Sequence, residues 1–225
     1  MSTYEDLAWD AEQESMMESI YQDFRSDPGV RESFIEELYD EIVTDFTAAR
    51  LQALYQEKPD IVIPAKTALD EARALLPQSP RAALILACTA AEVAFRRALL
   101  QPVVYGLVHT PSSAPLIAEL AIGQKDEGFL KVLCALLHQH GGVDLRVLKR
   151  ADSNKPLWEE MKDSSKKRNQ AVHAAADVQP DDAAVAIEVA AHLVEGVFPN
   201  VVSNLGLHLH GLRPCSGFQC APKGP

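Results

Sequence analysis

Apolar residues recur at helical spacing along most of the chain, and proline or glycine separates the segments. Two clear apolar stripes lie within residues 16–24 and 34–46, and the second has acidic residues on its opposite face. The turn sequence SDPG at 26–29 separates the two stripes. The pattern therefore predicts an acidic helical hairpin at the start of the chain, ending near residue 58, and very few strands.

The segment 79–100 carries the most informative helix prediction. Ser79 is a suitable N-cap, and Pro80 suits the first helical turn. No residue from Ala82 to Ala91 is charged, so this helix is expected to be central and buried nearly all round. Further helices are predicted over 62–75, 113–122, 127–139, 143–151, 155–174 and 183–198.

These elements predict an all-α fold, an up-and-down helical bundle with an N-terminal helical hairpin extension. We expect residues 1–58 to form the acidic extension, 59–198 the bundle, and 199–225 a loosely ordered tail rich in Gly and Pro. The tail contains four residues of types that bind metals: His208, His210, Cys215 and Cys220. Their spacing does not match the close cysteine pairs of structural zinc sites, so we expect neither a metal site nor a cofactor.

The composition is that of a globular protein, with 47% hydrophobic and 24% charged residues. Four cysteines are too few for a disulfide scaffold, and Cys88 and Cys134 lie in apolar runs where we expect them to be buried. The chain opens without a basic-then-apolar leader, because it is acidic from Glu5. We therefore expect a cytoplasmic protein without a membrane partner.

The net charge of −11 argues at first against a nucleic-acid partner, but the charge is unevenly distributed. Residues 1–60 hold 16 acidic and 4 basic side chains, whereas residues 61–225 hold 16 and 17. The most basic stretch, 146–173, has 8 basic and 4 acidic side chains. Such a stretch is either a solvated helix face or a surface that binds phosphates.

The basic stretch ends in a motif with the residue types that phosphodiester cleavage needs. Lys166, Lys167 and Arg168 stand ahead of Asn169 and His173. Histidine serves as acid or base near neutral pH, and arginine matches phosphate oxygens with a planar, permanent cation. From composition alone an Arg-x4-His pair arises about 0.3 times in this chain, and the triple with Asn about 0.006 times. The triple is therefore the informative signal.

A second motif follows the apolar run of the 79–100 helix, where Glu92 precedes Arg96 by four residues and Arg97 by five. Glu before Arg at this spacing favours a helical ion pair, so a salt bridge at the rim of the core is one interpretation. A carboxylate near the core is costly without a partner, so the other interpretation is that Glu92 faces specific cations.

Arg168-Asn169-x3-His173 resembles the signature of the HEPN superfamily, small α-helical bundles that are commonly metal-independent RNA endonucleases. That signature is Arg, four to six residues, then His, often with a polar residue directly after the Arg. Glu92-x3-Arg96-Arg97 is similar to the Glu-x3-Lys-Arg element of several members, with Arg96 in place of Lys. The resemblance covers about 60–198.

The resemblance implies an effector of the bacterial toxin or antiviral-defence kind. It would cut single-stranded or loop RNA and leave 2′,3′-cyclic phosphate and 5′-hydroxyl ends. His173 would be the acid/base, Arg168 the phosphate clamp, and Asn169 would orient one of them or the RNA. The expected supporting or RNA-binding residues are Glu92, Arg96, Arg97, Lys166 and Lys167.

Other interpretations stay open, because many HEPN proteins lack activity. A catalytically silent module would bind a protein partner or a nucleotide, and a plain helical adaptor is a third alternative. For an enzyme we expect a homodimer, in which a second copy of 168–173 supplies the second proton-transfer group, and an antitoxin or defence-system protein as a further partner. Residues 1–58 either pack on the bundle or compete with RNA through their acidic charge.

Overall fold

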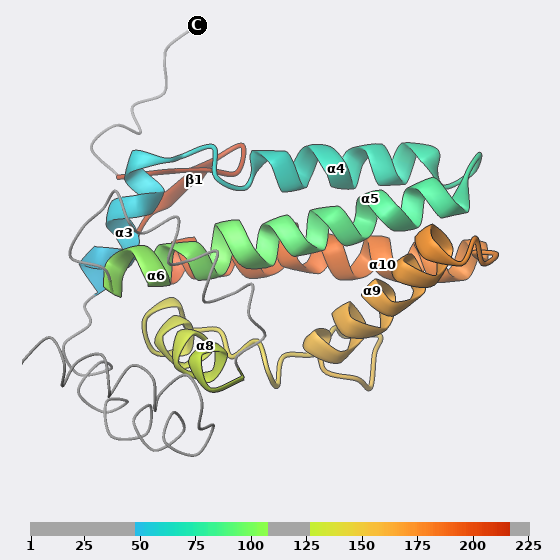
Figure 1. Ribbon diagram of the computed structural model, residues 1–225. Helices are drawn as coiled ribbons and strands as arrows, with labels where there is room; N and C mark the ends of the chain where they lie inside the picture. The colour runs from blue at the N-terminus through green and yellow to red at the C-terminus, as the bar shows by residue number, and fades with distance from the viewer. Residues whose placement is uncertain (1–47, 108–126, 217–225) are drawn as a thin grey trace, which may run out of the picture. The chain divides into compact units, whose positions relative to one another are not determined.

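The computed structural model describes residues 48–107 and 127–216 (Figure 1). The chain divides into two compact units, residues 1–45 and 46–225, and all described residues belong to the second. Helix α3 (Ala48–Glu57) is part of that second unit, so the division falls before this helix and not after residue 58. The predicted stripes at 16–24 and 34–46 and the predicted helix 113–122 lie outside the described residues.

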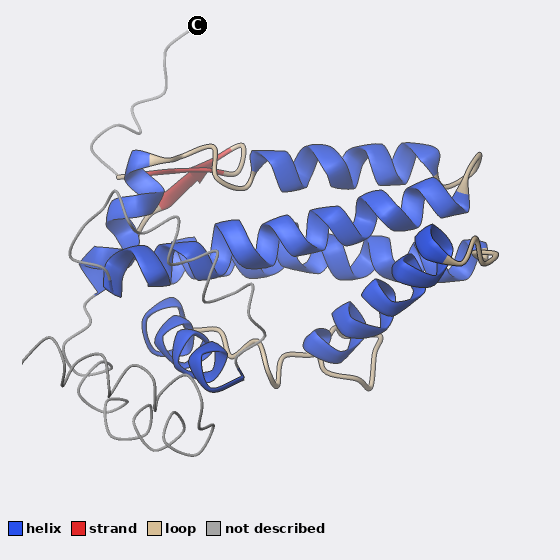
Figure 2. Ribbon diagram, viewed as in Figure 1, coloured by secondary structure: helices blue, strands red, loops and turns tan. Residues whose placement is uncertain are grey.

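The described part of the chain is mostly helical, as the sequence predicts, with a small two-stranded sheet near the C-terminus (Figure 2). Besides α3, the α-helices are α4 (Ile63–Leu75), α5 (Pro80–Val93), α6 (Gln101–Leu107), α8 (Glu127–Gly141), α9 (Leu157–His173), α10 (Pro180–Ala191) and α11 (Phe198–Asn204). Two π-helical segments, η1 (Ala94–Leu100) and η3 (His192–Val197), join α5 to α6 and α10 to α11. Each joined set is one long, continuous helix.

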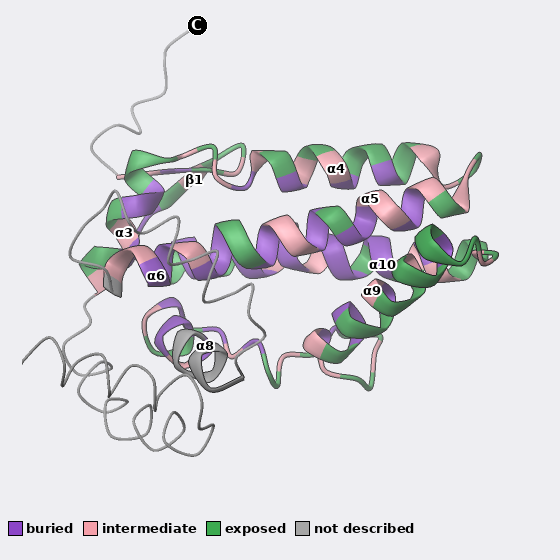
Figure 3. Ribbon diagram, viewed as in Figure 1, coloured by how far each residue is buried: buried purple, intermediate pink, exposed green. Residues whose placement is uncertain are grey.

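Helix α5 is the central element, as predicted. It packs against α4, α9 and α10, and its small residues allow these neighbours to approach closely (Figures 1 and 3). Its first turn is fixed by the predicted cap, because Ser79 Oγ accepts a hydrogen bond from the Ala82 amide at 3.3 Å. Pro80 occupies the first helical turn, where backbone N–H groups have no acceptor within the helix, so the missing N–H of proline costs no hydrogen bond.

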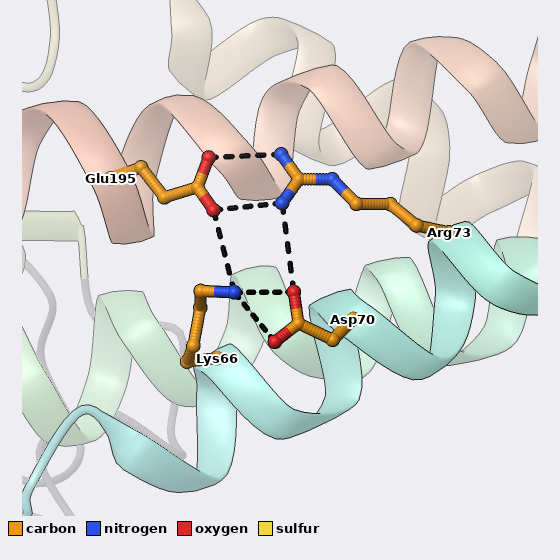
Figure 4. A network of polar contacts seen from close by, with 4 residues as sticks. All are labelled: Lys66, Asp70, Arg73 and Glu195. Carbon is orange, nitrogen blue, oxygen red and sulfur yellow. Dashed lines mark hydrogen bonds and ion pairs between the residues drawn. The ribbon is translucent and has the colours of Figure 1, made fainter.

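An ion-pair network fixes α4 against η3 (Figure 4). Arg73 donates two hydrogen bonds to Glu195, of 2.7 Å and 2.9 Å, and Lys66 lies between Glu195 and Asp70. The hydrogen bond from Arg73 lowers the pKa of Glu195. Because these side chains are exposed, the network contributes little to stability and mainly sets the register of two long helices.

The predicted helix 143–151 is wrong. The chain makes a single turn after Asp144, whose carboxylate accepts from the Arg146 amide at 3.0 Å, and then pairs with itself through a bridge between Lys149 and Pro156. Arg150 turns inward and donates two hydrogen bonds of 3.0 Å to Glu160 of α9. This tertiary ion pair outweighs the local helical pattern.

The predicted loosely ordered tail is also wrong over its described part. The last long helix runs on to Asn204, and strands β1 (His208–His210) and β2 (Arg213–Cys215) then form an antiparallel hairpin. Gly211 and Leu212 both have positive φ, as the two central residues of a type I′ hairpin turn require. The hairpin packs against α3 and α11.

The long helix 180–204 has a mean hydropathy of 1.4 over its most apolar window, enough by length and composition for a membrane span. Of that window, 61% is buried inside the protein, because α10 packs against α5, α4 and α9. The central position in the bundle accounts for the apolar composition of this helix.

Candidate functional site

A cleft of about 1080 Å³ runs along α9 and collects most of the predicted site residues. One wall is α9 itself, and the other comes from the junction of α5 with η1 and from the segment around α8 and the turn that follows it. The lining residues from outside α9 are Glu92, Phe95, Arg96, Cys134, Leu145, Arg146 and Ala174. From α9 they are Trp158, Met161, Lys162, Ser165, Lys166, Arg168, Asn169, Gln170 and His173.

The spacing of residues on α9 explains why one helix lines the whole cleft. Trp158, Lys162, Lys166, Asn169 and His173 follow one another at intervals of three or four, so they form one stripe along the helix. The buried residues of α9 occupy a different stripe, which packs against α5 and α10. Most cleft side chains of α9 therefore lie on a different stripe from its core side chains, and Met161, which is buried and also lines the cleft, belongs to both.

Glu92 and Arg168 join the two walls. Arg168 Nη2 donates a hydrogen bond to Glu92 Oε1, and the two side chains are 29% and 37% exposed, respectively. A guanidinium has five N–H donors, and among the described residues Arg168 bonds with no other side chain. The Nε and Nη1 donors of Arg168 therefore remain able to bind an anion that enters the cleft.

The predicted pairing of Glu92 with Arg96 does not occur between these described side chains. Glu92 is in the last turn of α5, and Arg96 lies in the π-helical segment, whose i→i+5 hydrogen bonds widen the turn. The i,i+4 geometry of a regular α-helix is thereby lost. The alternative interpretation, that Glu92 faces a specific cation, is confirmed with Arg168 as that cation.

The cleft brings together six of the eight predicted site residues, namely Glu92, Arg96, Lys166, Arg168, Asn169 and His173. Arg97 is exposed but does not line the cleft, because it follows Arg96 around the helix. Lys167 forms an ion pair with Asp182 in the first turn of α10, so it fixes the α9–α10 corner.

The backbone directly after His173 is held in an unusual conformation. Ala175 has φ of +50°, a left-handed conformation that is costly for a residue with a Cβ. Arg81 of α5 donates hydrogen bonds of 3.1 Å to the carbonyls of Ala175 and Ala176. These bonds stabilise the turn that ends α9 directly after His173, an exposed residue that lines the cleft.

The charges in the cleft differ in sign from those of the whole chain. Of the residues that the structure describes, five cationic side chains and one carboxylate, that of Glu92, line the cleft, while the chain as a whole has a net charge of −11. The five are Arg96, Arg146, Lys162, Lys166 and Arg168. Such a concentration of cations along a groove attracts polyanions and suits the backbone of a nucleic acid.

The other end of the cleft is apolar and was missed by the sequence analysis. The Trp158 and Phe95 rings lie 5.0 Å apart between centroids, and Leu145 and Met161 line the same cleft. Burial raises the pKa of the Cys134 thiol to about 11, so this cysteine acts as a small hydrophobic residue and not as a nucleophile. The i,i+4 spacing of the α9 stripe, extended back from His173, is the signal that leads to Trp158.

Within residues 48–107 and 127–216, no group of three His, Cys, Asp or Glu side chains is placed to hold a metal ion. His208 and Cys215 are cross-strand partners in the hairpin, and His210 stands opposite Arg213. The fourth tail residue, Cys220, lies outside the described residues.

No protein-family model, curated protein or solved structure matches the chain.

Proposed function

We propose that the protein is a metal-independent endoribonuclease of the HEPN kind, which cleaves RNA in the cleft along α9. The proposal rests on one observation: Arg168, Asn169 and His173 line the same groove, and five cationic side chains of the described residues line it too. The resemblance in sequence supplies the reaction, and the groove supplies a binding surface suited to the phosphates of the substrate. The same resemblance supports a role as a toxin or antiviral-defence effector, with an antitoxin or defence protein as partner.

The reaction needs two proton transfers and stabilisation of one group of anionic oxygens. A base takes the proton of the ribose 2′-hydroxyl, and the 2′-oxygen then forms a bond to phosphorus. The bond from phosphorus to the 5′-oxygen breaks, and an acid gives that oxygen a proton. The products are a 2′,3′-cyclic phosphate and a 5′-hydroxyl, with no change of oxidation state.

In this proposal Arg168 binds the phosphate oxygens, through the donors that Glu92 leaves unoccupied. Glu92 is a positioning residue, because it holds the guanidinium at the wall of the cleft. His173 performs one of the two proton transfers, and Asn169, one position after Arg168, orients the RNA or a catalytic side chain. Arg96 and Lys166 attract the RNA backbone.

The second proton-transfer group comes, in this proposal, from a second copy of the chain. Among the described residues, His173 is the one histidine that lines the cleft, and a two-fold interface would bring another His173 without any additional sequence. Mixing inactive His173→Ala subunits with wild type, followed by subunit exchange, should lower activity by more than dilution predicts. A monomeric enzyme with full activity would rule out the composite site.

Incubation of the pure full-length protein with total RNA in excess EDTA tests the enzyme directly. We expect cleavage to continue in the chelator and the products to carry 2′,3′-cyclic phosphate ends. His208→Ala is a matched control, since it removes an exposed histidine that does not line the cleft. No cleavage in any buffer would leave the catalytically silent, partner-binding or nucleotide-binding module as the better interpretation.

A further inference from the structure

The apolar end of the cleft contains an aromatic ring that the proposed chemistry does not use. Trp158 is half-buried, and its ring lies at 5.0 Å from that of Phe95, with a tilt of 39°. The ammonium of Lys162 lies 5.1 Å from the Trp158 ring centroid. The tryptophan is therefore covered by an aromatic neighbour and by a flexible lysine that can move away.

A planar aromatic ring beside a row of cations matches the two parts of a single-stranded nucleic acid. Nucleobases stack on aromatic side chains whatever their sequence, while lysine and arginine bind the phosphates that connect them. Lys162 can leave the ring and pair with a phosphate, because its stem is long and exposed. The exchange replaces one cation–π contact by a stacked base and a charge-assisted bond.

We infer that the Trp158 end of the cleft is a base-stacking subsite for single-stranded RNA. The inference rests on the proposed function and extends it, because it names a second point of contact with the RNA, at the base of a nucleotide. Trp158 precedes Arg168 by ten residues, which is about 15 Å along a helix at 1.5 Å per residue. The stacked base therefore belongs to a nucleotide at a distance from the cleaved phosphodiester.

The stacking contact and its distance from Arg168 each have a consequence for the choice of substrate. A base paired within a duplex is already stacked on its neighbours and cannot lie on Trp158, so single-stranded RNA is selected over the same sequence in a duplex. A dinucleotide is too short to occupy both ends of the cleft. Trp158 should therefore matter for longer oligonucleotides and not for a dinucleotide bound beside Arg168.

Binding is measured with a catalytically inactive protein, so that the result does not depend on cleavage. In the variant His173→Ala with Trp9→Phe, Trp158 is the only tryptophan, since the chain has two. Titration with a single-stranded RNA of about eight nucleotides should quench its emission, as expected when a base stacks on the ring. The duplex of the same sequence should leave the emission nearly unchanged.

Replacement of the ring gives the second measurement. On the His173→Ala background, Trp158→Leu should weaken binding of the same oligonucleotide by about 5- to 150-fold, whereas Trp158→Phe should retain most of the affinity. Dinucleotide affinity should be equal in all three proteins. Far-UV circular dichroism checks that each variant is folded. If Trp158→Leu does not fold, the quenching titration and the affinity of Trp158→Phe test the stacking subsite instead.

Absence of quenching, or unchanged affinity in a folded Trp158→Leu protein, would overturn the inference even where wild type cleaves RNA. Quenching by single-stranded RNA together with no cleavage by wild type would instead contradict the proposed enzyme and leave the stacking subsite standing. The two proposals therefore fail in distinguishable ways.

Discussion

Helix α9 forms two arginine–glutamate pairs, and they differ in almost every physical respect. At its N-terminal end Glu160 accepts two hydrogen bonds of 3.0 Å from Arg150, and these side chains are only 8% and 9% exposed, respectively. Toward its C-terminal end Arg168 donates a single bond to Glu92, and both are much more exposed. The same two residue types thus occur in a closed and in an open setting.

The closed pair belongs to the fold and the open pair to the site. A buried charge that loses its partner is not stabilised by water, so the Arg150–Glu160 pair holds the turn before α9 in place. An exposed pair contributes little to stability, and its arginine can exchange part of its contact for a phosphate. We therefore expect substitution in the closed pair to lower stability, and substitution in the open pair to lower activity.

The largest effect on stability is expected from Glu160→Ala, which removes the buried counter-charge of Arg150 and leaves it the exposed carboxylate of Asp152, at 3.2 Å. We expect the free energy of unfolding to fall by about 3–5 kcal/mol. Glu92→Ala, at the open pair, should change it by about 0–1 kcal/mol. Urea denaturation followed by circular dichroism measures both.

A double replacement tests whether loss of the buried counter-charge is the cause. Arg150→Met with Glu160→Leu removes both charges and fills the space with apolar side chains, so it should recover much of the lost stability. Equal losses in Glu160→Ala and Glu92→Ala would contradict the distinction between the two pairs.

At the open pair the expected effect is on cleavage. Without the Glu92 carboxylate the Arg168 guanidinium is no longer held at the wall, and a misplacement of about 1 Å can cost on the order of 100-fold in rate. We expect Glu92→Ala to lower kcat by about 10- to 100-fold, and Glu92→Gln, which still accepts the hydrogen bond, to retain most of the activity. A Glu92→Gln protein as slow as Glu92→Ala would show that the charge matters and not the position.

A fall in pH should destabilise the protein through the buried pair of Arg150 with Glu160. The hydrogen bond from Arg150 lowers the pKa of Glu160, so the folded state binds fewer protons there than the unfolded state. The resulting stability is fully present above the unfolded pKa of about 4.3 and is lost as the pH falls through the lower folded value. Unfolding free energies at about pH 5, 4 and 3 should therefore fall less steeply in Glu160→Gln than in wild type. An identical slope in the two proteins would contradict this role of Glu160.

The smallest expected effect concerns two neighbouring lysines. Lys166 lines the cleft, whereas Lys167 forms an ion pair with Asp182. If Lys166 neutralises one phosphate of a single strand, Lys166→Ala should reduce the slope of log affinity against log salt by about 0.7, and Lys167→Ala should change it less. Binding to the inactive His173→Ala protein at several salt concentrations gives the slopes.

Much of the bundle could be predicted because local signals agree with tertiary packing. Ser79 with Pro80 marks the start of α5, and its uncharged run predicts a central helix, which the structure confirms. The predicted helix 143–151 fails because Arg150 turns inward to a partner ten residues later, which no local pattern reveals. The C-terminal hairpin was missed because strands of three residues are too short to show an alternating pattern.

The candidate site shows the same limit. The spacing of Arg168, Asn169 and His173 on one helix was readable, and so were the cations near them. The partner of Glu92 was not, because a π-helical segment changes the turn between Glu92 and Arg96, and sequence periodicity assumes a regular helix. The contact between Phe95 and Trp158 joins residues far apart in the chain and emerges only from the packing of α9 on the α5 helix.

In the proposed function Arg168 and His173 cleave RNA and are not part of the structural core. The decisive experiment is single-turnover cleavage in EDTA with wild type, Arg168→Ala and His173→Ala, each at a matched folded fraction. We predict that each variant loses activity by at least about 100-fold, the scale of general acid–base catalysis, while its unfolding free energy changes by no more than about 1 kcal/mol. Folded variants that still cut RNA at the wild-type rate would contradict the account.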